Sequence, residues 1–87
     1  PLRFSMQLLI VCTGNTCRSP MAEAIARAAA SERGLADLRV GSAGTSAWEG
    51  APASDGALLV ALEHGLALET HRARTLSREL VSGADLI

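Results

Sequence analysis

A short apolar run that leads directly into a tight polar loop constrains this chain more than any other feature. Residues Leu8 to Val11 are all apolar, and the string CTGNTCRSP (residues 12–20) follows at once. An unbroken run of this length predicts a buried strand of the kind found in parallel sheets. Ser19 as N-cap and Pro20 in the first helical position predict a helix start. The segment therefore predicts a strand, a loop and a helix in direct succession.

Strand and helix patterns continue to alternate along the chain. We expect helices over 21–33, 55–64 and 77–82, and strands over 38–44 and 84–87. The glycines at 34 and 65 are placed to end the first two helices. This order predicts an α/β fold, with a parallel sheet and flanking helices in a Rossmann-like three-layer arrangement. Residues 1–87 are expected to form a single domain, which is truncated because the last strand has only begun.

The predicted helices carry apolar faces built mostly from small side chains. The chain contains sixteen Ala and thirteen Leu but one Phe, one Trp and no Tyr, so closely packed helices are expected. The first helix places Met21, Ile25, Ala28 and Ala29 on one face. The second helix is expected to turn its inner face to the core through Leu58, Ala61 and Leu62.

Charge and cysteine content exclude several classes of protein. The net charge is −1, which argues against a nucleic-acid partner. No apolar run approaches the length of a membrane span, and no membrane partner is expected. Two cysteines are too few for a disulfide scaffold, which favours a reducing, cytoplasmic location. They are also too few for a zinc site, so neither a metal nor another cofactor is expected.

The loop at residues 12–19 combines a nucleophile with features that bind an anion. It lies at the carboxyl end of a strand, where α/β sheets bind ligands. The following helix start contributes unpaired backbone N–H groups, and Gly14 allows a tight turn that forms an anion nest. The Arg18 guanidinium can grip two oxygens of an oxyanion. These positive groups favour a thiolate at Cys12.

Such a loop suits phosphoryl transfer to a thiol. The Cys12 thiolate would attack phosphorus in line while the loop holds the equatorial oxygens, and water would hydrolyse the resulting phosphocysteine. The Ser19 hydroxyl would stabilise the sulfur as it leaves. The loop differs from the nucleotide-binding P-loop, which requires Gly-Lys-Ser/Thr and magnesium.

The string VCTGNTCRSPMAE (residues 11–23) resembles the low-molecular-weight protein tyrosine phosphatases. The resemblance continues through Ser42-Ala43-Gly44-Thr45, the loop around Trp48, residues 71–74 and residues 85–87, so it covers nearly the whole chain. It implies a phosphatase I-like fold, of which residues 1–87 would be the N-terminal part. It also implies a cytoplasmic, cofactor-free hydrolase acting on a phosphotyrosine protein or a small phosphomonoester, with phosphate or a similar oxyanion in the loop.

The resemblance assigns roles to matching positions. It makes Cys12 the nucleophile, Arg18 the phosphate clamp and Cys17 a redox partner of Cys12. Asn15 would hold the loop in its strained shape through hydrogen bonds to supporting residues, and Trp48 would line the substrate cleft. The supporting residues are Ser42 and His71. The phosphate-binding loop itself would comprise Thr13, Gly14, Asn15, Thr16, Cys17 and Ser19.

One departure from the family pattern concerns the general acid. The family uses an aspartate in an Asp-Pro loop, and no Asp-Pro occurs here. The aspartates present are Asp37, Asp55 and Asp85, and we expect Asp85 to be a polar residue near the site. A positioned acid typically contributes about 10²–10⁴-fold to such a reaction.

Three functions follow from this sequence. The first is tyrosine phosphatase activity through phosphocysteine. The second is arsenate reduction on the same fold, which the lack of a third cysteine disfavours. The third is a non-catalytic phosphate or phosphotyrosine-binding module, which the missing acid favours. The arginines that follow Arg18 in the sequence are expected to be solvated on the surface. They are Arg27, Arg33, Arg39, Arg72, Arg74 and Arg78.

Overall fold

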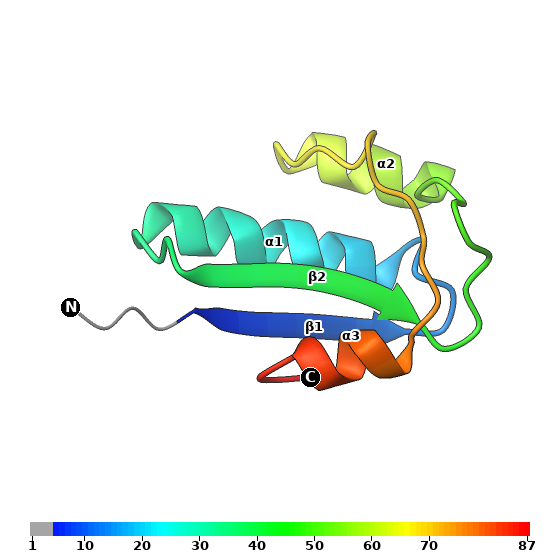
Figure 1. The fold of residues 1–87 in the computed structure, drawn as a ribbon. Coiled ribbons are helices and arrows are strands. Elements are labelled where there is room, and N and C mark those ends of the chain that lie inside the picture. The colour runs from blue at the N-terminus through cyan, green and yellow to red at the C-terminus, as the bar shows by residue number, and fades with distance from the viewer. Residues whose placement is uncertain (1–4) are drawn as a thin grey trace.

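The chain adopts an α/β fold in the computed structural model, which describes residues 5–87. Strands β1 (Met6–Cys12) and β2 (Leu38–Gly44) lie side by side and are connected through helix α1 (Arg18–Glu32). Helices α2 (Asp55–Glu63) and α3 (Arg78–Gly83) follow. Figure 1 shows α1 along one side of the strand pair and α3 on the other. The predicted fold class, a parallel sheet with flanking helices, is confirmed.

The two strands pair in parallel and end together. Cys12 lies opposite Gly44, so the two carboxyl ends meet at one edge of the sheet. The strand predicted over 84–87 is present as a single parallel bridge between Leu86 and Leu8. Strand β1 therefore lies between β2 and this bridge.

The predicted start of α1 is wrong in detail. The helix begins at Arg18, and Cys17 occupies the N-cap position without a side-chain cap. Ser19, the expected N-cap, lies inside the first turn, where its hydroxyl contacts Cys12 and Asn15. The local capping preference of serine is outweighed here because the loop offers this hydroxyl two partners in a buried site.

The predicted helix ends agree with the structure. Gly34 and Gly65 have φ angles of 66° and 72°, the left-handed conformation that glycine adopts readily after a helix. Ser54 caps α2 by accepting a hydrogen bond from the Ala57 N–H at 3.2 Å. These signals depend on near neighbours in the sequence, so they can be identified from it directly.

The hydrophobic core lies between α2, the segment that follows it and α1. Its buried members are Ala53, Ala57, Ala61 and Leu68. The inward orientation predicted for Leu62 is wrong, because its side chain is 68% exposed. Helix α2 packs through its alanines, which turns this leucine to solvent. None of α1, α2 and α3 in the described part of the chain has the length and apolar character of a membrane-spanning helix.

The apolar face predicted for α1 lines a groove rather than a closed core. Met21, Ile25, Ala28 and Ala29 border an apolar groove of about 430 Å³ between α1 and α2. Ile25 on this face is 54% exposed. The predicted periodicity is therefore correct, whereas the face is only partly covered.

Candidate active site

The loop after β1 is fixed on two sides by backbone hydrogen bonds. The Thr13 carbonyl accepts from the Ser46 N–H at 2.9 Å, beyond the end of β2. The Thr16 carbonyl accepts from the Ser54 N–H at 2.8 Å, at the start of α2. The loop therefore has a defined shape set by two segments that are distant from it in sequence.

Asn15 adopts the strained backbone conformation in this loop. Its φ is 56°, in the left-handed region that few residues other than glycine occupy and that asparagine tolerates best. The sequence favoured Gly14 for the tight turn, but Gly14 does not have a positive φ. Asn15 is fully buried, so surrounding contacts must compensate for this strain.

The Asn15 side chain and carbonyl connect four segments of the chain. Its Nδ2 donates to Ser19 Oγ at 2.8 Å and to Ser42 Oγ at 2.9 Å. Its Oδ1 accepts from the Arg74 N–H at 2.9 Å, and its backbone carbonyl lies 2.7 Å from His71 Nε2. The structure thus brings Ser42 and His71 to the loop, where the resemblance to the phosphatases placed them.

Cys12 lies at the centre of these contacts. Its Sγ is 2.9 Å from Ser19 Oγ and accepts a hydrogen bond from the Asn15 N–H at 3.3 Å. Burial raises the pKa of the Cys12 thiol, but hydrogen bonds from Ser19 and Asn15 and the nearby Arg18 charge outweigh it, so the pKa lies below its ordinary value of 9.0. The site therefore favours the nucleophilic thiolate.

A cavity of about 420 Å³ opens beside the Cys12 side chain. Its lining residues are Ile10, Val11, Cys12, Thr13, Arg18, Ser19, Ala22 and Thr45. Cys12, whose thiol has a lowered pKa, and Arg18 therefore line the same space. This arrangement suits a small tetrahedral anion, which the guanidinium can bind while the sulfur attacks it.

No carboxylate of residues 5–87 lines this cavity. The position predicted for Asp85, near the site, is wrong. Its Oδ2 accepts a hydrogen bond from the Gln7 N–H at 2.7 Å, near the amino end of β1 and remote from Cys12. The parallel pairing causes this placement, because the segment at 85–86 joins β1 where that strand begins. The described residues therefore supply no general acid at the cavity.

Trp48 and Cys17 lie outside the cavity lining. Trp48 is 84% exposed, on the segment that follows β2. Cys17 is exposed, and both cysteines are free thiols. The stacking role of Trp48 and the redox role of Cys17 stay predictions.

Gly44 is a site residue whose role the sequence did not reveal. A Cβ atom there would lie 2.5 Å from the Thr13 carbonyl oxygen and 2.9 Å from the Ala47 Cβ. Only glycine lets the end of β2 approach the loop this closely. The partners are far apart in sequence, so nothing local marks this requirement.

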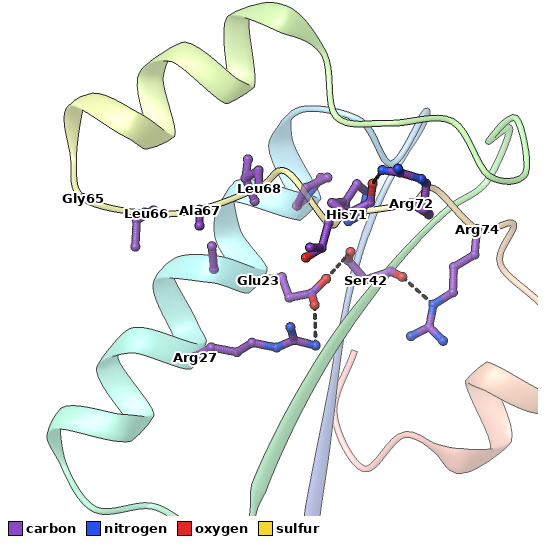
Figure 2. Close-up of a pocket in the computed structure, with 13 residues that line it drawn as sticks. Glu23, Arg27, Ser42, Gly65, Leu66, Ala67, Leu68, His71, Arg72 and Arg74 are labelled. Atoms are coloured by element: carbon purple, nitrogen blue, oxygen red, sulfur yellow. Dashed lines mark hydrogen bonds and ion pairs between the residues drawn. The ribbon is translucent and has the colours of Figure 1, made fainter.

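Glu23 is the second such residue, and Figure 2 shows it beside Ser42. Its Oε1 accepts the Ser42 hydroxyl hydrogen at 2.5 Å, and its Oε2 pairs with Arg27 Nη2 at 2.6 Å. These residues and the segment after α2 border a second cavity, of about 540 Å³. Glu23 thereby contacts the Asn15 network from the side opposite Cys12.

Arg27 and Arg74 are exposed, as predicted, and in addition both donate hydrogen bonds to β2. Arg27 donates through Nε and Nη2 to the Val40 carbonyl at 3.1 and 2.8 Å. Arg74 donates through Nε to the Ser42 carbonyl at 2.8 Å. These carbonyls would otherwise lack partners on this strand, and the guanidinium donors satisfy them.

Comparison with known proteins places this geometry in a family. Residues 7–87 match the low molecular weight phosphotyrosine protein phosphatases. The low molecular weight protein-tyrosine-phosphatase Wzb of Escherichia coli is 46% identical over 80 residues, covering 92% of this chain and 51% of that protein. The crystal structure of the low molecular weight protein tyrosine phosphatase from T. tengcongensis superposes with a TM-score of 0.87 at 48% identity, covering 95% of this chain and 57% of that one.

A cysteine-to-serine mutant of the YwlE arginine phosphatase, with a phosphorylated active-site serine, is also similar. It has a TM-score of 0.86 at 42% identity and covers 93% of this chain and 52% of its own. The chain belongs to the low-molecular-weight protein tyrosine phosphatase family. It spans about half the length of the curated relatives it matches.

Proposed function

We propose that the protein hydrolyses phosphomonoesters of protein substrates through a phosphocysteine formed on Cys12. The observation that carries this proposal is the environment of the Cys12 sulfur, which has Ser19 Oγ at 2.9 Å, the Asn15 N–H at 3.3 Å and Arg18 on the same cavity. Family membership adds independent support.

Two steps account for the reaction. The Cys12 thiolate attacks phosphorus, so an S–P bond forms and the ester P–O bond breaks, while Arg18 binds the phosphoryl oxygens. Water then attacks phosphorus, the S–P bond breaks and the thiolate is regenerated, with the Ser19 hydroxyl donating to the departing sulfur. Thr13, Gly14, Asn15, Thr16 and Cys17 provide the backbone of the proposed phosphate-binding loop.

The substrate class we propose is a phosphotyrosine protein. Relatives named as tyrosine phosphatases and a relative named as an arginine phosphatase are similarly close, at 46% and 42% identity. Phosphoarginine, in which a P–N bond would break in place of the ester P–O bond, is therefore the second candidate. A cytoplasmic location is proposed because a thiolate nucleophile requires a reducing compartment. Residues 1–87 are proposed to be the N-terminal part of the phosphatase domain.

An activated ester is the right first substrate, because its leaving group needs little protonation. The complete polypeptide is mixed with p-nitrophenyl phosphate, quenched in acid and weighed by mass spectrometry. We expect release of nitrophenol and a protein species carrying one phosphate. Both are lost in Cys12→Ala and kept in the control Ser31→Ala, an exposed position near the end of α1. Alanine is preferred to serine because a relative's active-site serine can hold phosphate.

Each contrary outcome identifies a different alternative. Phosphate binding without nitrophenol release would make the protein a binding module. Phosphate retained on Cys12→Ala would place the nucleophile elsewhere. Once activity is established, phosphotyrosine and phosphoarginine peptides of one sequence distinguish the two substrate classes.

A further inference from the structure

Glu23 is partly buried between α1 and β2 although it does not line the Cys12 cavity. Its side chain is 13% exposed, whereas that of its ion-pair partner Arg27 is 63% exposed. One carboxylate oxygen faces Arg27 and the other faces the Ser42 hydroxyl (Figure 2). A carboxylate held in this way can only accept hydrogen bonds.

Glu23 and the Arg74 N–H together fix the direction of the hydrogen bonds behind Cys12, each from one side of the Asn15 amide. The Ser42 hydroxyl has one hydrogen, and it is directed to Glu23. The Ser42 oxygen therefore accepts from Asn15 Nδ2. Asn15 cannot turn its amide around, because its Oδ1 accepts the Arg74 N–H on the other side.

The same direction continues to the sulfur. Asn15 Nδ2 also donates to Ser19 Oγ at 2.8 Å, which leaves the Ser19 hydrogen free for Cys12 Sγ at 2.9 Å. Asn15, Ser19 and Ser42 are 0%, 1% and 3% exposed, so water does not compete for these bonds. Buried hydrogen bonds in series polarise one another.

We propose that Glu23 is a positioning residue for Cys12, acting through Ser42, Asn15 and Ser19 so that the Ser19 hydroxyl donates to the sulfur. The inference rests on the proposed function of Cys12 as nucleophile. Arg27 supports this role by holding the second carboxylate oxygen. Glu23 itself touches neither the Cys12 cavity nor a reacting atom.

Other charged residues lie near the hydrogen bonds that lead from Glu23 to Cys12, and the test must separate their effect on Cys12 from that of Glu23. Arg18 is the charged residue that lines the Cys12 cavity. Arg27 from α1, and His71, Arg72 and Arg74 from the segment after α2, line the cavity beside Glu23. The substitutions below leave all of these in place.

Glu23→Gln distinguishes direction from shape. Glutamine has the shape of glutamate, but its amide nitrogen is a donor. Because Arg27 presents only donors, the amide oxygen turns toward Arg27 and the nitrogen faces Ser42, which leaves the Ser42 hydrogen without its acceptor. A purely steric role for Glu23 predicts no upward shift in this variant, because loss of the carboxylate charge alone would move the Cys12 midpoint downward. Our proposal predicts that it resembles Glu23→Ala.

The measurement is the rate of Cys12 alkylation by iodoacetamide against pH, on the complete polypeptide, with peptide mapping to separate Cys12 from Cys17. The wild-type midpoint is expected below 9.0. We expect Glu23→Gln and Glu23→Ala to move it upward by about half a unit to one unit. Glu32→Gln, an exposed position on the same helix, is the matched control and leaves it unchanged.

A double-mutant cycle tests the route through Ser42. In a Ser42→Ala background, Glu23→Gln is expected to produce no further upward shift. A Glu23→Gln midpoint that does not lie above that of the wild type overturns the proposal, as does an equal upward shift in the Ser42→Ala background. Alkylation requires no phosphate chemistry, so a shifted midpoint without phosphatase activity would contradict the proposed function alone.

Discussion

The loop after β1 and the face between α1 and α2 are organised in opposite ways. Around the loop, the polar side chains of Asn15, Ser19 and Ser42 are almost wholly buried. Between the helices, apolar side chains that line the groove are exposed, with Ile25 at 54% and Val60 at 39%. Within residues 5–87, these polar side chains are therefore buried more completely than these apolar side chains.

This difference shows what holds the candidate site in shape. Among the described residues, no buried side-chain nitrogen or oxygen lacks a hydrogen-bond partner. The core beside the loop consists largely of alanines, which contribute little burial each. The loop is therefore held by directed hydrogen bonds and by close backbone approach, and substitutions there should have larger effects than those on the helix face.

The largest effect is expected from Asn15→Ala. It removes the side-chain bonds to Ser19, Ser42 and Arg74 and leaves a Cβ residue at a φ of 56°. We expect the free energy of unfolding to fall by about 3 kcal/mol or more, measured by urea denaturation of the complete polypeptide. Asn15→Gly is the matched control and should be about 1 kcal/mol more stable than the alanine variant, because it relieves the strain. Equal stability of the two would show that the backbone conformation is not strained.

A smaller loss is expected from Gly44→Ala. The added Cβ would lie 2.5 Å from the Thr13 carbonyl oxygen, so β2 or the loop must move. We expect a loss of about 2 kcal/mol in the same assay, together with slower turnover of p-nitrophenyl phosphate. Gly56→Ala in α2 is the control, since no atom lies within 4 Å of its added Cβ. It should stabilise the protein by about 0.5 kcal/mol, and a loss at Gly56 as large as that at Gly44 would refute the steric explanation.

The smallest effect is expected on the solvent side of α2. Leu62→Ala removes a side chain that is already 68% exposed, so the free energy of unfolding should change by no more than about 0.5 kcal/mol. Leu68→Ala, at a position 5% exposed, is the matched comparison and should lose about 2–3 kcal/mol. A large loss at Leu62 would mean that this face is covered in the complete polypeptide, and the contrast between the two regions would weaken.

Local signals in the sequence were sufficient for most of the fold. Apolar runs and glycines identified both strands and the ends of α1 and α2, because these features depend on residues within a few positions. Periodicity failed for Leu62, since several neighbouring positions of α2 are apolar and the pattern does not say which of them faces the core. The capping preference of Ser19 failed because its hydroxyl is hydrogen-bonded to Cys12 and Asn15 inside the buried loop.

The candidate site was predictable only in part. The spacing of Cys12 and Arg18 indicated the chemistry, and family resemblance brought in Ser42 and His71. Glu23 and Gly44 were missed because their roles depend on contacts with distant segments; Glu23, for example, meets Ser42 across 19 positions. Pairings of this kind are set by the topology of the sheet and leave no local pattern.

The arginine donors along β2 have a consequence for how the molecule avoids aggregation. An uncovered sheet edge recruits strands from other molecules. On β2 the Val40 and Ser42 carbonyls are occupied by Arg27 and Arg74, and Gly44 is paired with the segment at 74–76. The opposite flank of the sheet lies beside β1, where Leu86 already pairs. The contacts on β2 cover part of its edge, which disfavours the addition of a strand from another molecule there.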